Sequence, residues 1–401
     1  QHRPGQGSDS FSRRGVTLSL NQMVFDGFFT RSEVSRLGHA RLARYFELLE
    51  ASENVALEAS RAYADVLRYR ELVRFAQENY AAHRMLYDQI AERYRAGIGR
   101  RVDLDQAAGR LALSESNLLT EVSNLHDVSA RFLRVVGVPP ADTLPPFDYV
   151  HDVVTLPPTV QDALREAFVT NPSINAAVEG VRAAQAGIGS ARAAFQPKVD
   201  LRARQSVDYN RDHLSSSSRD SVVEAVLSYN LYRGGADRAR MRQAAEVLNQ
   251  SLDLLEKACR NLRQTLSIAY NDVQRLREQI RYLEQHKISV SRTRIAYRQQ
   301  FEIGQRTLLD LLNTENEYFQ ACRALVNARI DQIIAQLRTL HSMGRLMSTL
   351  GVTRHDLPSI GELDPQRGGI DPDSLCPPYA PGMIEIDKER VLEEALRASG
   401  L

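Results

Sequence analysis

The sequence predicts a mainly helical protein with a smaller β part, built from two copies of one structural unit. The first observation is an internal repeat. Residues 62–71 read Ala-Tyr-Ala-Asp-Val-Leu-Arg-Tyr-Arg-Glu and residues 269–278 read Ala-Tyr-Asn-Asp-Val-Gln-Arg-Leu-Arg-Glu, so seven of ten positions agree at an offset of 207. The same offset aligns Gly97 with Gly304 and continues without a gap. A copy this long is half of an architecture used twice, because solenoid units are much shorter.

The second observation is a heptad pattern in both copies, which predicts long coiled-coil helices. Residues 29–95 contain no proline and a single glycine, Gly38. A helix of that length would reach about 100 Å at 1.5 Å per residue. The positions that carry the pattern are Leu48, Ser52, Val55, Ala59, Ala62, Val66, Tyr69, Val73, Ala76 and Tyr80 in the first copy, and Leu248, Leu252, Leu255, Cys259, Leu262, Leu266, Ala269, Val273, Leu276, Ile280 and Leu283 in the second.

Each long helix is followed by a short break and a second heptad helix. In the first copy the break lies at residues 96–99 and the returning helix covers residues 104–136. In the second copy the break lies at Ile303 and Gly304, and the returning helix begins at Leu308 and ends near residue 350. Because so few residues separate the helices, each pair is expected to fold back as an antiparallel hairpin.

The third observation is strand periodicity in three segments, at residues 16–21, 199–209 and 223–231. Apolar and polar side chains alternate in each segment, as in a strand with two different faces. Two arrangements share this pattern. An ordinary sheet would turn its polar face to water, whereas a transmembrane barrel would turn its apolar face to lipid and its polar face to the lumen.

The composition argues against several classes of protein. The 401 residues are 25% charged with a net charge of +1, so no nucleic-acid partner is expected. No run of eighteen apolar residues exists, which argues against a membrane-spanning helix. The three cysteines lack close spacing, so we expect neither a zinc site nor a disulfide framework and interpret them as bystanders. The sequence contains neither a histidine cluster nor a Gly-rich phosphate loop, the kinds of motif that would indicate an enzyme. We therefore expect no cofactor.

These patterns divide the chain into six segments. Residues 358–382, rich in proline and glycine, are expected to be loose. The segments are 1–28 (N-terminal segment and a barrel strand, with the upstream part of repeat 1 absent), 29–136 (hairpin of repeat 1), 137–198 (linker and short helices of repeat 2), 199–232 (barrel β-hairpin), 233–350 (hairpin of repeat 2) and 351–401 (C-terminal tail).

Four short motifs and the order of elements resemble those of the TolC family of outer-membrane export channels. The motifs are Phe-Glu-Ile-Gly-Gln-Arg-Thr-Leu-Leu-Asp-Leu-Leu at 301–312, Tyr-Arg-Ala-Gly at 94–97, Tyr-Arg-Gly-Gly at 232–235 and Gln196-Pro197 before a strand. The resemblance covers residues 16 to about 350 and is greatest to the type I secretion branch. In that family, leading helices and a first strand would precede residue 16. We therefore expect either a chain that has lost its beginning or a barrel with one strand fewer per protomer, and favour the first.

The resemblance implies a trimeric channel in the bacterial outer membrane with a periplasmic extension. Each protomer would give four strands to a shared barrel in the outer-membrane lipid and two coiled-coil hairpins to an α-helical periplasmic tunnel. The implied partners are a periplasmic adaptor (membrane fusion) protein, an inner-membrane ABC transporter and an exported, toxin-like protein substrate. Two alternatives remain: an outer-membrane factor of a drug or metal efflux pump, and a soluble coiled-coil scaffold.

The resemblance also implies a pore ring at Asp310. The matching acid in the family lies where the inner helices converge, so three copies would form a ring of carboxylates that favours cations. The alternative follows from the sequence itself, because Thr307 and Asp310 have the spacing of a capping box. A second acid common in the family is replaced here by Asn313, so we expect no second charged ring and a weaker block by cations.

The remaining candidate residues lie beside the helix breaks. Asp103, Arg306 and Phe301 match positions that close the channel in the family; the alternative is ordinary solvated surface charge. The tips of the hairpins match the surface that meets the adaptor, although glycines there also suit a purely structural helix-turn-helix. The tip residues are Gly97, Ile98, Ile303, Gly304 and Gln305.

Overall fold

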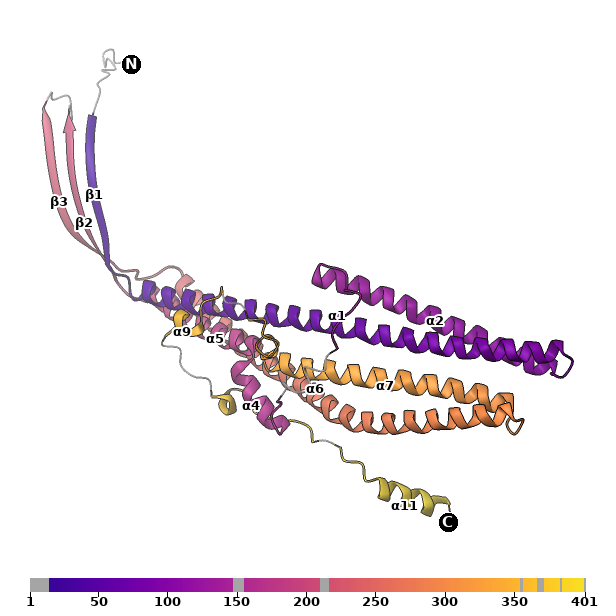
Figure 1. Cartoon of the computed structure of the whole chain (residues 1–401). Coiled ribbons are helices and arrows are strands. Elements are labelled where there is room, and N and C mark those ends of the chain that lie inside the picture. The colour runs from indigo at the N-terminus through magenta and orange to yellow at the C-terminus, as the bar shows by residue number, and fades with distance from the viewer. Residues whose placement is uncertain are drawn as a thin grey trace, which may run out of the picture. The chain divides into compact units, whose positions relative to one another are not determined.

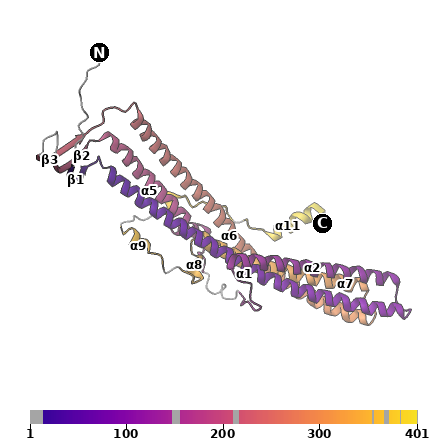
Figure 2. The same ribbon diagram turned by 90° about the horizontal axis from the view of Figure 1, so that it is seen from above.

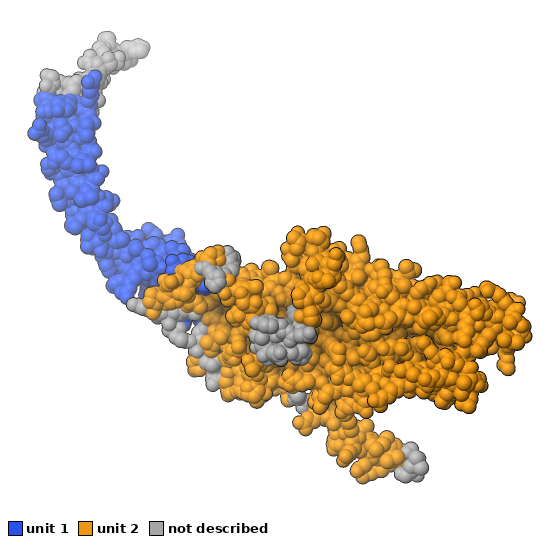
Figure 3. All heavy atoms as spheres, in the orientation of Figure 1, with its two compact units in different colours: residues 1–45, 176–257 blue, residues 46–175, 258–401 orange. Residues whose placement is uncertain are grey.

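The computed structural model describes residues 14–146, 155–209, 216–353, 356–365, 371–382 and 384–399. The chain forms two compact units, one of residues 1–45 and 176–257 and the other of residues 46–175 and 258–401 (Figure 3). The elements, labelled in Figure 1, are β1 (Arg14–Phe25), α1 (Phe29–Arg95), α2 (Arg101–Val136), α4 (Val160–Thr170), α5 (Pro172–Arg192), the 3-10 turn η1 (Ala193–Phe195), β2 (Lys198–Tyr209), β3 (Ser217–Ser228), α6 (Ala236–Glu302), α7 (Leu308–Ser342), α8 (Leu346–Thr349), α9 (Ile360–Leu363), α10 (Pro372–Leu375) and α11 (Lys388–Ser399).

The sequence repeat is also a repeat of helices. Helices α1 and α6 both have 67 residues, and adding 207 to the first and last residue of α1 gives those of α6. The same offset takes the start of α2 at Arg101 to the start of α7 at Leu308. Helix α2 runs back along α1 in both views (Figures 1 and 2). Helix α7 runs back along α6 (Figure 1), and ion pairs such as Arg298 with Glu315 join the two. The two halves are therefore matching long hairpins.

In the larger unit, α7 packs against the helices of the other hairpin through the heptad positions. Phe75 and Ala76 of α1 contact Phe319 and Cys322 of α7 in one apolar cluster. Further clusters on either side join the same two helices. Part of the apolar stripe predicted from the sequence is thus buried between the hairpins, where it stabilises the fold. Other positions of the stripe, such as Val55 at 60% and Leu252 at 45%, are exposed.

In the smaller unit, α5 packs closely on the beginning of α1. A Cβ atom on Gly189 would lie 2.7 Å from Oγ of Ser32, so any larger residue would force Ser32 to move. The carboxylate of Glu179, fully buried, lies 2.8 Å from Nδ1 of His39 and accepts a 2.8 Å hydrogen bond from Arg182. His39 and Arg182 thus give the buried carboxylate of Glu179 the partners that such a group needs.

The smaller unit also contains an antiparallel sheet of order β1-β2-β3. Leu20 of β1 pairs with Ala203 of β2, which pairs with Val223 of β3, so the apolar side chains share one face. That face is open to solvent, with Leu20 67% and Val223 81% exposed. The other face holds polar pairs such as Arg202 with Glu224. Apolar residues that face outward in register match lipid-facing strands.

None of the described helices combines the length and the apolar character needed to cross a membrane.

The expectation for two of the cysteines was wrong, and so was the expectation that residues 371–382 are loose. Cys259 and Cys376 form a disulfide, with their Cα atoms 5.8 Å apart. The two residues are 117 positions apart, and spacing gave no sign of the bond because the tail folds back onto α6. The tail is ordered around α10, and the Cys376 side chain is fully buried. Only Cys322 remains a free, buried thiol among the described residues.

Candidate functional site at the hairpin tips

The two hairpin tips are built in the same way. Gly97 has φ +76° and Gly304 has φ +79°, the left-handed region that side chains disfavour. A Cβ atom would meet nothing within 4 Å at either position, so backbone conformation, not close helix approach, calls for glycine. Beside these turns, Ile98 is 80% and Ile303 69% exposed. Each tip therefore presents an exposed isoleucine beside a glycine turn. Gln305, next to Gly304, closes the second turn by donating its backbone N–H to the carbonyl of Gln300.

Asp310 forms the capping box that the sequence predicted. Its backbone N–H donates to Oγ1 of Thr307 (3.2 Å), and its carboxylate accepts from the backbone N–H of Thr307 (3.4 Å). An ion pair of 3.8 Å also links the carboxylate to Arg306. The Asp310 side chain remains 37% exposed, so it can also interact outside the chain. A structural role and an electrostatic role are compatible here.

Arg306 and Asp103 do not contact each other within the chain. The Arg306 guanidinium donates to the side-chain oxygen of Gln300 (2.9 Å) and lies 4.3 Å from the ring centroid of Tyr297. Asp103 lies in the first turn of α2 and is half-buried. Among the described residues, no hydrogen bond or ion pair reaches its carboxylate. Any link between these two positions must therefore join different protomers or a different state of the protein.

Phe301 and Asn313 are tied to the opposite hairpin. Phe301 is buried in a cluster with Leu86 of α1 and Leu311 of α7, and the Arg93 guanidinium lies 5.3 Å from its ring centroid. The side-chain oxygen of Asn313 accepts a 2.7 Å hydrogen bond from Arg110 of α2. Both residues thus contribute to packing of one hairpin against the other near the tips.

Two buried carboxylates inside the coils were missed by sequence reasoning. Glu315 of α7 is 2% exposed and pairs with Arg298 (2.6 Å) and Arg294 (3.5 Å) of α6. Glu121 of α2 is also 2% exposed and pairs with Arg323 of α7 (2.8 Å), which links the two hairpins. Glu315 continues the heptad spacing of the buried Leu308 and Leu312, and an acid at such a core position was the signal that would have identified it. Glu121 gave no such signal, because the heptad pattern of its helix predicts the neighbouring Val122 as the core position, and Val122 is 47% exposed.

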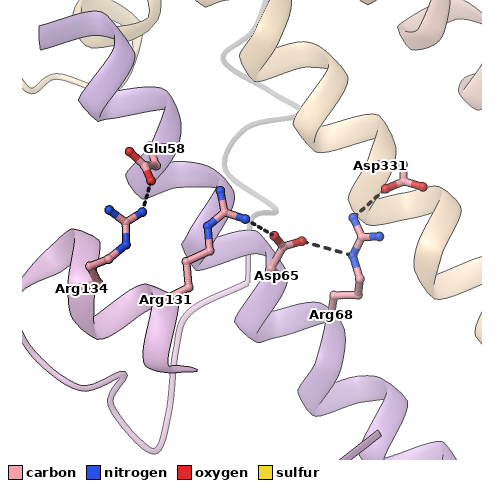
Figure 4. A network of polar contacts seen from close by, with 6 residues as sticks. All are labelled: Glu58, Asp65, Arg68, Arg131, Arg134 and Asp331. Carbon is pink, nitrogen blue, oxygen red and sulfur yellow. Dashed lines mark hydrogen bonds and ion pairs between the residues drawn. The ribbon is translucent and has the colours of Figure 1, made fainter. Parts of the chain in front are cut away.

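The duplicated motif joins each long helix to its returning helix. Asp65 lies 3.8 Å from Arg131, and Asp272 lies 3.4 Å from Arg338, which is the same ion pair at the offset of 207. Figure 4 shows that Asp65 also faces Arg68, whose guanidinium reaches from α1 to Asp331 of α7. Burial raises the pKa of Asp65, and the guanidinium groups around it oppose that change.

The tyrosines of the same motif hold the linker between the two copies. Tyr63 donates a hydrogen bond to the carbonyl of Pro145 (2.6 Å). Tyr270, at the matching position, lies within hydrogen-bonding distance of the carbonyls of Pro157 (2.8 Å) and Pro158 (2.9 Å). The two copies of the motif, at 62–71 and 269–278, thus have the same structural role, because each copy holds one end of the linker between the repeats.

His83 is a further buried polar group inside the helical unit. Its side chain is 3% exposed, and burial, together with the positive charge of Arg110, lowers its pKa to about 4. The imidazole is therefore neutral at physiological pH and serves as a buried polar core residue. One turn before it, Asn79 is also buried, so the seam between the hairpins is not purely apolar.

The sequence over residues 2–138 and 163–345 matches the family described as outer membrane efflux protein. The chain belongs to this family. Members of the family are transport proteins and not enzymes.

The relatives come from several export systems. The chain is 27% identical over 329 residues to the alkaline protease secretion protein AprF of Pseudomonas aeruginosa, covering 80% of this chain and 68% of that one. It is 26% identical over 335 residues to the outer membrane efflux protein BepC of Brucella suis, covering 82% and 72%. It is 22% identical over 360 residues to the outer membrane protein TolC of Escherichia coli, covering 86% and 72%.

Solved structures show the same fold. CusC superposes with a TM-score of 0.73 at 18% identity, covering 84% of this chain and 79% of that chain. VceC of Vibrio cholerae gives a TM-score of 0.70 at 19% identity, covering 83% and 87%. These likenesses confirm the expected fold class, a TolC-like channel fold of long antiparallel helix pairs with a few strands. The protein is an efflux or export channel of the bacterial outer membrane with a helical periplasmic extension.

Proposed function

We propose that the chain is the outer-membrane channel of a type I secretion system, a passive conduit through which a protein substrate leaves the cell. Three copies close around one axis. The strand in residues 1–28 and the hairpin 199–232 contribute to a barrel, and the hairpins 29–136 and 233–350 form the wall of the tunnel. Energy comes from an inner-membrane ABC transporter, which connects to the channel through a periplasmic adaptor.

The observation that carries this proposal is the sheet, whose apolar face has no cover within the described residues. Leu18, Leu20 and Leu227 are between 67% and 76% exposed and lie in register on the same face. A sheet of three strands leaves both edges of its backbone unpaired, which closure into a barrel removes. In a barrel, the apolar face of the sheet would contact lipid on the outside, and the polar face would line the lumen.

The cargo is inferred from the resemblance and from one relative. From the sequence motifs we infer the type I branch, and within it a channel like that of the adenylate cyclase–haemolysin exporter, whose cargo is a protein toxin. AprF is named for secretion of alkaline protease and shares 27% identity. BepC, named as an efflux protein, is related to a similar degree, so drug or metal efflux is the second candidate. Membership of an outer-membrane family excludes the soluble scaffold.

The test for cargo class is complementation. The chain is expressed in a bacterium that lacks its own channel but keeps the adaptor and ABC transporter of a secreted protein, and in a second strain that lacks the channel of a drug pump. Restored secretion of the protein into the medium, without restored drug resistance, is the expected result. Resistance restored without secretion would assign the chain to efflux.

Asp310 is expected to control the affinity of the channel for cations. Three carboxylates at a constriction attract multivalent cations. In planar bilayers, Asp310→Asn is therefore expected to raise the concentration of trivalent cation needed for half-block about tenfold, which corresponds to about 1.4 kcal/mol. Asparagine keeps a side-chain acceptor for the cap. The matched control Thr307→Ala removes the other half of the capping box and should leave the block unchanged; the opposite pattern would reduce Asp310 to a cap.

A further inference from the structure

The C-terminal tail runs beside α6 and contacts it at four successive points. Cys376 is bonded to Cys259, and the carbonyl of Pro377 accepts a 2.8 Å hydrogen bond from Arg263. Farther along, Arg275 donates to the carbonyl of Ile384, and Lys388 donates to the hydroxyl of Tyr282 while its Nζ lies 4.1 Å from the Tyr282 ring centroid. The contacts follow the same order in both segments, so the tail lies along about 35 Å of helix at 1.5 Å per residue.

The same tail segment also contacts the helix that follows the linker. Helix α10, directly before Cys376, packs against α4. Residues Pro381, Ile384 and Ile386 form one wall of a cavity of about 470 Å³, whose other wall includes Val160 of α4 and Tyr270 of α6. The tail thus bridges two helices on which the linker between the repeats also rests.

The disulfide is the dominant attachment of this segment. Ile384 is 80% exposed and Ile386 67% exposed, so the chain beyond Cys376 buries little apolar surface. The remaining contacts are single hydrogen bonds from the partly exposed side chains of Arg263 and Arg275, and the contact of Lys388 with Tyr282. Each of these contributes little in water. A covalent bond that closes a long loop is different, because it restricts the chain whenever the other contacts open. Without it, the weak contacts have to hold the tail alone.

We propose that the Cys259–Cys376 disulfide is a redox-controlled clasp that fixes residues 376–382 and 384–388 along α6 and releases them when it is reduced. Oxidation removes two electrons and two protons from the two thiols and transfers them to a disulfide-bearing oxidant, which becomes a dithiol. Reduction by a dithiol reverses the exchange. The bacterial periplasm is an oxidising compartment, so the clasp is closed in the working channel. Its opening removes the wall of the cavity that Pro381, Ile384 and Ile386 form.

The state of the clasp can be measured by alkylation, because the free thiol of Cys322 is buried and does not interfere. Cys322 is 1% exposed, and burial raises the pKa of its thiol, so it reacts slowly with alkylating reagents. In the native full-length chain we expect no rapidly alkylated thiol before mild treatment with dithiothreitol, and two after it, at Cys259 and Cys376. Rapid alkylation of these two residues before reduction would show that the clasp does not form.

Release of the tail is measured by limited proteolysis with chymotrypsin after Tyr379. Because this residue lies between the contacts at Pro377 and Ile384, a protease must lift the segment off α6 to cut it. We expect cleavage to become at least tenfold faster after reduction of the folded protein and in Cys376→Ser, and to stay unchanged in Cys322→Ser. Trypsin cleavage after Arg397, beyond the last contact, is the reference, measured in a parallel digestion. Equal cleavage rates at Tyr379 in the oxidised and the reduced protein would overturn the proposal. Because the disulfide is reduced in the protein after it has folded, this comparison does not depend on whether a variant folds.

Discussion

Arg323→Met is expected to destabilise the helical unit by about 3–5 kcal/mol, the cost of leaving a buried charge without its partner. Glu121 is 2% exposed, and Arg323 donates to it across the seam between the hairpins at 2.8 Å. Once the guanidinium is removed, the only other donor to the carboxylate among the described residues is the Asn124 amide, at 3.4 Å. Methionine keeps most of the volume of the arginine stem, so lost packing contributes little. The measurement is the midpoint of thermal unfolding in detergent.

Two control variants separate buried charge from lost contact. Glu121→Gln should cost less, because Arg323 is 35% exposed and water can solvate its charge. The double variant Glu121→Leu with Arg323→Met should recover most of the loss, since it removes both charges. Arg329→Met breaks the 2.6 Å ion pair between Arg329, which is 57% exposed, and Glu284, which is 42% exposed. This variant should lower the stability of the protein by only about 0–1 kcal/mol. Equal effects of Arg323→Met and Arg329→Met would contradict the importance given to burial.

Leu20→Arg is expected to prevent insertion of the sheet into the outer membrane. Leu20 lies within β1, is 67% exposed, and shares the apolar face with Ala203 and Val223. An arginine that faces lipid near the middle of the bilayer costs about 2–4 kcal/mol, and a trimer would carry three. The measurement is the fraction of the chain that co-sediments with outer membranes after cell lysis.

Thr17→Arg is the matched control on the same strand. Thr17 lies on the opposite face of the sheet, paired with Ser206, so the charge would point to the polar side. We expect this variant to reach the outer membrane in nearly normal amounts. A loss of insertion in Thr17→Arg that equals the loss in Leu20→Arg would show that the two faces of the sheet do not differ in their surroundings.

The helices could be predicted from the sequence because their pattern is local and repeated. The heptads set which faces are buried, and Gly97 and Gly304 mark the turns because only glycine suits their backbone there. The alternation of apolar and polar residues in the strands predicted a sheet with two different faces. An ordinary sheet and a transmembrane barrel both show this alternation. The sheet register and the exposure of Leu20 were needed to favour the lipid-facing one.

The polar sites were less predictable, since they depend on which helices meet. The capping box at Thr307 and Asp310 is local and was found; the pair of Glu121 with Arg323 spans two hairpins and was not. The bond of Cys259 to Cys376 depends on a tail that returns over a long distance. Asp103 and Arg306 were proposed as a gate, and a single chain leaves them apart, so that role stays a prediction about the assembly.

The most direct test of this account is the mass of the chain extracted from outer membranes, measured by light scattering or native mass spectrometry in detergent. One chain has a mass of 45.1 kDa. We predict a protein component of about three times that mass, found only in the detergent extract, and its absence for Leu20→Arg, since closure of a barrel removes the open edges and apolar face of the sheet. A monomer recovered in the soluble fraction without detergent would contradict the trimeric, lipid-facing channel.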